Sequence, residues 1–336
     1  MQWNIPLFCS LQYVLEFAST NHRGFFLSII QPFIIPKRYE NLHRQGQFFV
    51  YRGDLEHPYA PGNKWHKLKY HLLEAQARQA KYIASLGGPY SNHLHAFAQT
   101  LKTHLEFKAL AVIRGELHPR LTPTLRDVVW NGVELWPALR RDYKRGLHAD
   151  VIKQINALYG DVYWIPEGGG GELGAKGCLD WAKHIEALDN QYDAWVVSAG
   201  TGTTAAGLLS HPQPVDLHVI SALKGAEHQR ADILALALSL RQLEKLKTNS
   251  TQTEQALDER LFFHSEAHEG GFAKHSGSLL EFIDECNAVN PDLPLDPIYT
   301  CKTLFYVMKQ WHKGDWPYRR TLLIHTGGLQ GWRGYA

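Results

Sequence analysis

The chain has 336 residues, 44% of them hydrophobic and 20% charged, so it can bury a large core and is long enough for two domains. Its 35 basic and 33 acidic residues give a net charge of +2, which provides no overall field to attract nucleic acid or an anionic membrane surface. The four cysteines are scattered without a Cys-x-x-Cys pair, which argues against a zinc knuckle or a disulfide scaffold and favours a reduced, cytoplasmic setting.

The first 28 residues are expected to be an extra N-terminal segment without a nameable role. No Lys or Arg precedes Arg23, and no apolar run reaches the roughly 18 residues that a membrane-spanning helix requires. We therefore expect neither a signal peptide nor a transmembrane segment. Residues 29–61 contain several prolines around one strand candidate at 47–51, which predicts an irregular arm.

From residue 64 onward, helical and strand patterns alternate. The expected helices are 67–80, 91–104, 149–158, 173–188, 203–209, 227–246, 278–289 and 302–312. The expected strands are 81–86, 107–113, 162–165, 194–198, 215–220 and 322–324. This alternation predicts an α/β protein whose parallel sheets are covered by helices on both faces.

Glycine-rich junctions between a strand and a helix are the first places to look for ligand sites, because ligands of such folds bind beyond the carboxyl ends of the strands. The chain has three: Gly87-Gly88, residues 168–171, and Gly200-Thr201-Gly202-Thr203-Thr204. In the third, glycines allow close approach to the backbone and three threonine hydroxyls add donors, as a phosphate site requires. It matches neither the P-loop of NTPases nor Gly-x-Gly-x-x-Gly, and an ordinary tight turn is the alternative.

Lys64 precedes a helical pattern, where most lysines are solvated surface charges. A functional role for its amine is favoured by two other features of the sequence. These are the candidate phosphate loop at 200–204 and the hydroxyl, amide and imidazole groups of Ser91-Asn92-His93. A cofactor that needs one amine, one phosphate loop and several donors directed at a ring is pyridoxal 5'-phosphate, whose aldehyde condenses with lysine.

Six motifs occur in the order seen in the 1-aminocyclopropane-1-carboxylate (ACC) deaminase/D-cysteine desulfhydrase family, which the chain resembles over roughly residues 32 to 334. They are Gly62-Asn63-Lys64-x-x-Lys67-Leu68, Gly87-Gly88-x-x-Ser91-Asn92-His93, Pro166-x-Gly168-Gly169, Gly200-Thr201-Gly202-Thr203-Thr204, Asp296-Pro297-Ile298-Tyr299-Thr300 and His325-Thr326-Gly327-Gly328.

This resemblance implies the tryptophan-synthase-β-like fold of pyridoxal-phosphate enzymes (fold type II), with two three-layer αβα domains built on parallel sheets. The larger, cofactor-binding domain would comprise residues 29–75 and 185–336, and the smaller one residues 76–184. A homodimer is the usual form in the family, and a small amino acid is the usual substrate.

The resemblance also implies roles for individual residues. The lysine matching Lys64 holds the cofactor covalently and acts as a base, and the amide matching Asn92 contacts the ring hydroxyl of the cofactor. The serine matching Ser91 lies at the substrate carboxylate, beside Asn92 and His93, and relays protons. The tyrosine matching Tyr299 stands near the reacting carbon. The loop matching Gly200, Thr201, Gly202, Thr203 and Thr204 binds the phosphate.

Two further positions separate the activities of the family. ACC deaminases carry glutamate directly after the tyrosine and leucine directly after the histidine of the last motif, whereas desulfhydrases carry threonine at both. This chain has Thr300 and Thr326, expected near the cofactor ring. Since a hydroxyl favours the protonated pyridine nitrogen less than a carboxylate does, the pair favours β-elimination from D-cysteine, giving pyruvate, ammonia and hydrogen sulfide.

Departures from the family pattern keep two alternatives open, a cofactor-binding protein with little turnover and ACC deaminase itself. The family usually has arginine at His66, tyrosine at Phe272, glycine at Cys301 and proline near Gln330. The first three changes remove a permanent cation, an aromatic hydroxyl and a residue free of φ restriction.

Histidines 264 and 268 are spaced as two metal ligands on one helix face would be, but the sequence does not match His-Glu-x-x-His. We therefore expect no metal site. The tryptophans lack interleaved basic runs, which favours core packing over nucleic-acid binding.

Overall fold

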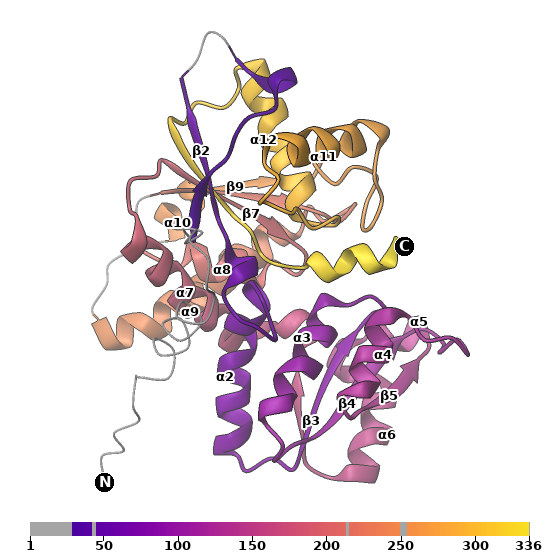
Figure 1. Ribbon diagram of the computed structural model, residues 1–336. Helices are drawn as coiled ribbons and strands as arrows, with labels where there is room; N and C mark the ends of the chain where they lie inside the picture. Colours follow the sequence, from indigo (N-terminus) through magenta and orange to yellow (C-terminus); the bar gives the residue numbers. More distant parts are fainter. Residues whose placement is uncertain (1–28, 42–44, 213–214, 249–253, 336) are drawn as a thin grey trace, which may run out of the picture.

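The computed structural model describes residues 29–41, 45–212, 215–248 and 254–335, so the segment 1–28 lies outside the described residues. Its strands form two separate sheets, which build the two lobes of the molecule (Figure 1). No helix in the described part of the chain is both long and apolar enough to cross a membrane.

The larger sheet has six strands in the order β1-β2-β10-β7-β8-β9. All neighbours are parallel except β1, which pairs antiparallel with β2 at one edge. The strands are β1 (Ile30–Pro32), β2 (Gln47–Tyr51), β7 (Ala194–Ala199), β8 (Asp216–Ser221), β9 (Leu261–His264) and β10 (Arg320–Ile324).

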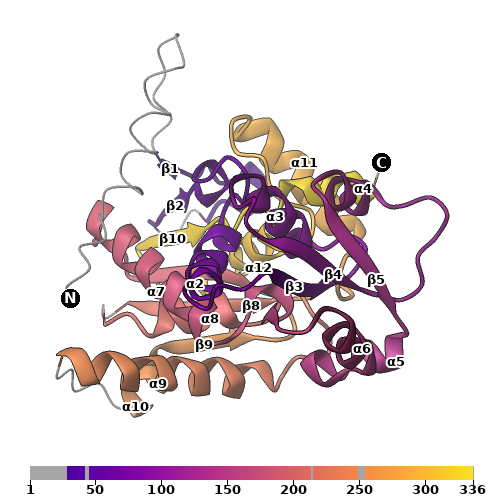
Figure 2. The same ribbon diagram turned by 90° about the horizontal axis from the view of Figure 1, so that it is seen from below.

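Side chains of this sheet alternate between two apolar layers, as a sheet covered on both faces requires. Val196 and Leu323 pack under α11 (Gly277–Val289) and α12 (Thr300–Lys313). Val197 and Leu322 pack under α7 (Gly171–Leu188) and α8 (Thr203–Leu209). Helices α7, α8 and α9 (Gln229–Thr248) lie side by side on this second face, and α2 (Asn63–Ala77) packs against α7 (Figure 2).

The smaller sheet has four parallel strands in the order β5-β4-β3-β6. They are β3 (Tyr82–Gly87), β4 (Lys108–Arg114), β5 (Val133–Ala138) and β6 (Val162–Ile165). Helices α2, α3 (Asn92–Thr100) and α4 (Pro123–Trp130) cover one face, and α5 (Arg140–Tyr143) and α6 (Asp150–Tyr159) cover the other. The strands of the two sheets fall in the residue ranges predicted for the two domains, although the domain boundaries themselves stay a prediction.

The remaining short elements are α10 (Glu254–Arg260) and six 3-10 turns. Those turns are η1 (Lys37–Tyr39), η2 (Gly53–Leu55), η3 (Leu101–Thr103), η4 (Gly146–His148), η5 (Glu167–Gly169) and η6 (Leu329–Gly334).

Each element expected from residue 64 onward is present, within four residues of the predicted bounds. The end of the 91–104 segment forms η3 rather than a continuation of α3. Among the described helices and strands from residue 64 onward, five were not predicted: α4, α5, α10, β5 and β9. The largest shift at a helix start is in α2, which begins at Asn63 rather than Lys67, so that Lys64 lies inside the first turn.

Helix α2 is held in place by its contact with α7, where glycine permits backbone contact. A β-carbon at Gly177 would lie 1.7 Å from the backbone oxygen of His66. The two helix axes can therefore approach closely only while residue 177 has no side chain.

Gly177→Ala is expected to destabilise the protein by about 1–3 kcal/mol, because the new methyl group overpacks the interface between α2 and α7. The matched control is Gly277→Ala at the start of α11, where a β-carbon would meet no atom within 4 Å. Urea unfolding measures both. Equal stability of the two variants would contradict the tight contact.

Candidate active site

The three glycine-rich junctions meet at a cavity of about 450 Å³ that also receives the loop after β10. Gly88 follows β3, Gly168 follows β6, Gly200 follows β7 and Thr326 follows β10, so the carboxyl ends of strands from both sheets border the same space. The cavity thus has the position and size expected of a small-molecule site in an α/β protein.

Lys64 places its amine in this cavity from the first turn of α2. Its Nζ donates to Oδ1 of Asn63 at 2.6 Å. Burial, followed by the nearby charge of Lys67, lowers the pKa of Lys64 to about 7. A large share of the amine is consequently neutral near pH 7, as a nucleophile requires.

The loop at 200–204 is fixed from two sides by groups outside it. Nδ2 of Asn63 donates to Oγ1 of Thr204 at 2.9 Å, and Nε2 of Gln229 donates to the backbone oxygen of Gly200 at 2.5 Å. Nζ of Lys67 lies 3.4 Å from Oγ1 of Thr201, which adds a cation to the hydroxyls of the loop. Amides, hydroxyls and an ammonium group together fit an anionic oxygen cluster such as phosphate.

Ser91, Asn92 and His93 open α3 at the cavity wall. Oγ of Ser91 accepts the backbone N–H of Leu94 at 3.2 Å as the helix N-cap, which leaves its own proton available. His93 is buried, and its Nε2 lies 2.7 Å from Oγ of Ser85.

The tautomer of His93 follows from its partner. The hydroxyl of Ser85 donates to the backbone oxygen of Ile165 at 2.9 Å, so it accepts from Nε2–H of His93 and leaves Nδ1 with a lone pair. Nδ1 is buried without a hydrogen-bond partner in the described part of the chain. Burial, together with the charges of Lys64 and Lys67, holds the pKa of His93 well below its ordinary value, so the ring is neutral.

Tyr299 reaches the cavity from the start of α12, where a buried carboxylate fixes the backbone. Asp296 accepts three successive backbone N–H groups at 2.6–3.0 Å, those of residues 298, 299 and 300. A β-carbon at Gly200 would lie 3.2 Å from the Tyr299 hydroxyl, so glycine makes room for it. Burial and the charge of Asp296 raise the pKa of Tyr299, which keeps its proton on the oxygen.

The structure places most of the predicted site residues around this cavity. Two of them are buried next to it and do not contribute to its lining. Thr326 lines the cavity, and its Oγ1 lies 3.3 Å from Oγ of Ser198. Thr203 and Thr300 are buried and do not line it. Oγ1 of Thr300 is buried without a hydrogen-bond partner among the described residues.

Three charged residues of the cavity were not singled out as site residues from the sequence. Lys67 lies three residues after Lys64 on α2, a spacing that puts both on one helix face. Arg114 and Glu167 stand at or just after the carboxyl ends of β4 and β6, the position that marks ligand contacts in this fold class. Arg114 forms no ion pair with another described residue.

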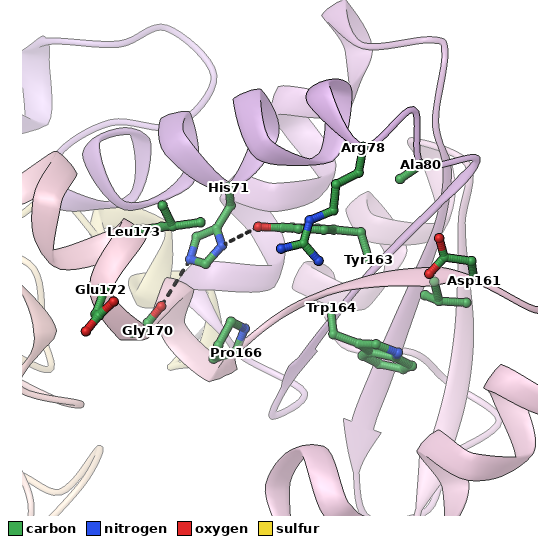
Figure 3. A pocket seen from close by; sticks show the side chains of 12 residues that line it. His71, Arg78, Ala80, Asp161, Tyr163, Trp164, Pro166, Gly170, Glu172 and Leu173 are labelled. Atoms are coloured by element: carbon green, nitrogen blue, oxygen red, sulfur yellow. Dashed lines mark hydrogen bonds between the residues drawn. The ribbon is translucent and has the colours of Figure 1, made fainter.

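A second cavity, of about 460 Å³, lies along the edge strand β6 (Figure 3). Its polar side chains already have protein partners: Nδ1 of His71 lies 3.1 Å from the hydroxyl of Tyr163 and Nε2 lies 3.0 Å from the backbone oxygen of Gly170. Arg78 pairs with Glu74 at 2.7 Å. His71 and Arg78 are therefore already engaged within the protein. None of the predicted site residues lines this second cavity.

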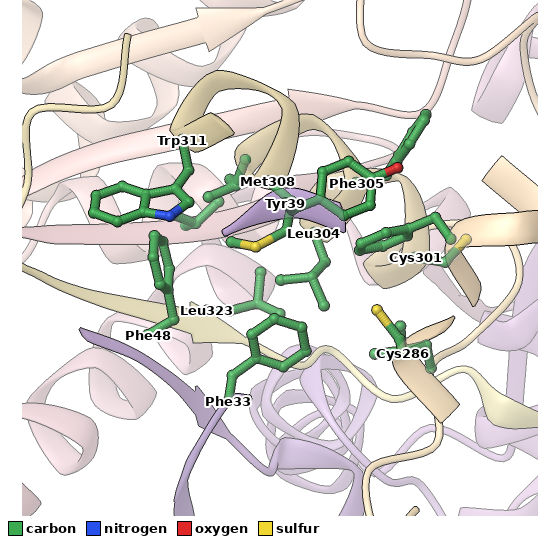
Figure 4. Close-up of a cluster of buried hydrophobic side chains, with 14 of the residues drawn as sticks. Phe33, Tyr39, Phe48, Cys286, Cys301, Leu304, Phe305, Met308, Trp311 and Leu323 are labelled. Carbon is green, nitrogen blue, oxygen red and sulfur yellow. The ribbon is translucent and has the colours of Figure 1, made fainter. Parts of the chain in front are cut away.

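Of the departures from the family pattern, two point away from the active cavity. His66 stacks on Trp181 with ring centroids 4.5 Å apart, and its Nε2 lies 2.9 Å from Oε2 of Glu56. Cys301 is fully buried in the apolar core under α12 (Figure 4). Only Phe272 lines the cavity, with its ring centroid 6.2 Å from that of Tyr299.

The histidines considered for metal binding have other partners. Nε2 of His264 lies 3.0 Å from Nδ1 of His218, and Nδ1 of His264 lies 2.9 Å from the hydroxyl of Tyr306. Nδ1 of His268 accepts the backbone N–H of Gly270 at 3.0 Å. Within the described ranges, no group of three or more His, Cys, Asp or Glu side chains is arranged to hold a metal ion.

The residues present fit pyridoxal phosphate on observations of the protein alone. The cavity offers an amine with a pKa of about 7, a loop of amides and hydroxyls next to the Lys67 amine, and the amide of Asn92. The unpartnered Nδ1 of His93, which lines the cavity, is a buried acceptor that lacks a partner from the described part of the chain.

Comparisons with known proteins agree with this reading. No protein-family profile matches the chain. The chain is 28% identical over 290 residues to a Thermotoga maritima protein provisionally named ACC deaminase, covering 84% of this chain and 89% of that protein. It is 24% identical to the mitochondrial bifunctional D-cysteine desulfhydrase/ACC deaminase of Arabidopsis thaliana, covering 85% of this chain and 73% of that protein.

Solved structures show the same relationship in the fold. An ACC deaminase homologue superposes with a TM-score of 0.73 at 24% identity, covering 91% of this chain and 90% of that one. A pyridoxal 5'-phosphate-dependent aspartate racemase superposes with a TM-score of 0.60 at 14% identity, covering 90% of each chain.

These findings confirm the predicted fold class, that of the fold-type-II pyridoxal-phosphate enzymes, and the predicted cofactor is that of this class. Within it, the chain is similar to proteins whose names include ACC deaminase and D-cysteine desulfhydrase. The resemblance carried by the six sequence motifs is thereby confirmed.

The pKa of Lys64 predicts how cofactor attachment depends on pH. The rate at which cofactor-stripped protein regains visible absorbance with added pyridoxal phosphate should rise through about pH 7 and level off above it. An ordinary lysine would instead give a rise through about pH 10. A rate that still climbs steeply above pH 9 would contradict a buried, neutral amine.

Lys67→Met is expected to weaken cofactor binding about 10- to 100-fold, because a charge-assisted contact to the phosphate is lost. It should also move the pH midpoint of attachment upward, since Lys67 lowers the pKa of Lys64. The matched control is Lys69→Met on the same helix, where the amine pairs with Asp180 at 3.1 Å. Wild-type affinity in Lys67→Met would contradict its placement at the phosphate.

Proposed function

We propose that this protein is a pyridoxal-phosphate-dependent lyase that acts on a small amino acid, with D-cysteine as the best candidate substrate. The observation that carries the proposal is the partly buried amine of Lys64, whose pKa is lowered to about 7 and which shares one cavity with a phosphate-type loop and the donors of Ser91 and Asn92. The bound cofactor would supply an aldehyde for attachment and a ring that withdraws electrons from the α-carbon of the substrate.

The residues of the chain divide the remaining work among them. Lys64 would hold the cofactor, release it when the substrate amine takes its place, and then accept the α-proton at Nζ. The Ser91 hydroxyl, whose lone pair is used by the helix cap, would donate to the substrate carboxylate. Tyr299 keeps its proton and stands 3.2 Å from a β-carbon built on Gly200, where it could protonate the departing sulfur.

Elimination from D-cysteine breaks the bond between the β-carbon and sulfur and consumes one water, giving pyruvate, ammonia and hydrogen sulfide. Thiolate is a good leaving group, so this reaction demands less electron withdrawal than opening a cyclopropane ring. Thr300 and Thr326 support this choice because neither can act as the carboxylate partner of a protonated ring nitrogen. The name of the Arabidopsis relative includes both activities.

Phe272 favours the same reaction at a lower turnover. It fills a cavity position where the family usually has a tyrosine, so the Tyr299 hydroxyl stands beside a ring without one. A pyridoxal-phosphate-binding protein with little turnover, and ACC deaminase, are the two alternatives. A homodimer and a cytoplasmic location remain predictions.

Purified protein loaded with cofactor should absorb visible light, and Lys64→Ala should abolish both the band and any product formation, because Lys67, the other lysine that lines the cavity, is placed at the loop 200–204. D- and L-forms of cysteine and other β-substituted amino acids should then be assayed for keto acid, ammonia and sulfide, with Lys69→Met as the control. We expect pyruvate and sulfide from D-cysteine.

The other outcomes assign the alternatives. Coloured protein that releases neither pyruvate nor sulfide would favour a cofactor-binding protein with little turnover. Efficient formation of 2-oxobutyrate from ACC would favour a deaminase. Protein that stays colourless with added cofactor would refute the proposal.

A further inference from the structure

Gln330 connects the cavity to the outer wall of the smaller lobe. It lies in η6, the C-terminal segment that passes between the two lobes (Figure 1). Its Nε2 donates to Oδ1 of Asn92, and its Oε1 accepts from Oγ1 of Thr124 on α4 at 3.2 Å. The three polar side chains form one relay from α4 through η6 to α3.

This relay decides which end of the Asn92 amide is free. A carboxamide has one oxygen that accepts and one nitrogen that donates two protons. Gln330 occupies the oxygen of Asn92, and Nδ2 of Asn92 has no hydrogen-bond partner among the described residues. The group that Asn92 offers in the cavity is therefore an N–H donor.

The loop after β10 reinforces this orientation. A β-carbon at Gly328 would lie 2.8 Å from Nδ2 of Asn92, so the amide nitrogen rests directly over a position that must be glycine. Gly328 also has φ +89°, a conformation that favours glycine. The contacts with Gln330 and Gly328 together fix the position and orientation of the Asn92 side-chain amide.

We propose that Gln330 is a positioning residue that holds the Asn92 amide so that its Nδ2 donates to the anionic ring oxygen of the cofactor. The inference rests on the proposed function, because it needs pyridoxal phosphate in the cavity. Proline, which the family usually has near this position, has no side-chain amide and could not make the contact. Such outer partners orient the groups that touch a bound ligand.

The same segment provides a matched control. Nη1 of Arg333 lies 2.5 Å from Oδ2 of Asp127, which also pairs with Nε2 of His95 at 3.1 Å. Arg333 therefore ties η6 to α4, as Gln330 does, but it does not contact Asn92. A variant of Arg333 weakens the link between the lobes without removing the partner of the amide.

The test is a pH titration of the visible band in cofactor-loaded protein. Gln330→Met should raise the pH midpoint of the band by roughly 0.5 to 1 unit and weaken cofactor binding several-fold. Without a steady donor, the ring oxygen becomes more basic and holds the proton that it shares with the lysine-bound nitrogen more tightly. Gln330→Glu, which presents only acceptors, should shift the midpoint in the same direction and serves if the Met variant does not fold.

Two further variants separate positioning from general loosening. Arg333→Met should keep the wild-type midpoint. Asn92→Ala should shift it at least as far as Gln330→Met, and the double variant should shift it no further than Asn92→Ala alone, because both act through one hydrogen bond.

The possible failures are distinguishable. Coloured wild-type protein with an unchanged midpoint in the Gln330 variants would overturn the inference and leave the proposed function standing. An equal shift in Arg333→Met would also overturn it, by assigning the effect to the link between the lobes. Wild-type protein without a visible band would overturn the proposed function, and this inference with it.

Discussion

The site depends on a backbone contact between the start of α2 and the loop after β10. A β-carbon at Gly62 would lie 2.2 Å from the backbone oxygen of Thr326, and one at Gly327 would lie 2.7 Å from that of Pro61. Both glycines have positive φ, and the backbone N–H of Asn63 donates to the Thr326 oxygen at 3.3 Å. This contact puts Lys64 and Thr326 on the same cavity, and the charge state of the amine follows from the burial it creates.

Much of the fold could be predicted because the hydrophobic periodicity of a strand or helix is visible within a short stretch of sequence. Most of the site could be predicted because its motif residues directly follow the ends of strands. Helix α4 and strand β5, which were not predicted, each contain a proline, a residue that ordinarily interrupts a helix or a sheet. Pro123 takes the first helical position after the N-cap Thr122, and Pro137 lies in an edge strand, where a missing donor is tolerated. The contact between Gln330 and Asn92 spans 238 positions and leaves no local signal.

The departures from the family pattern acquire different meanings in three dimensions. In the sequence, His66 lies within the lysine motif and suggests a weakened site. In the structure it packs on Trp181 and Glu56, away from the cavity, and Cys301 lies in the core. Phe272 remains the change at the reacting groups, and Gln330 emerges as an added contact to them. Sequence position alone could not separate these cases, because neighbours on a helix face different surroundings.

We propose that Lys64, rather than Lys67 three residues later, carries the cofactor. The most direct measurement is reduction of cofactor-loaded protein with borohydride, which converts a lysine-bound aldehyde into a stable secondary amine, followed by mass spectrometry of the peptides. We expect a pyridoxyl phosphate group on Lys64. A modified Lys67, or no modified lysine in the cavity, would contradict it.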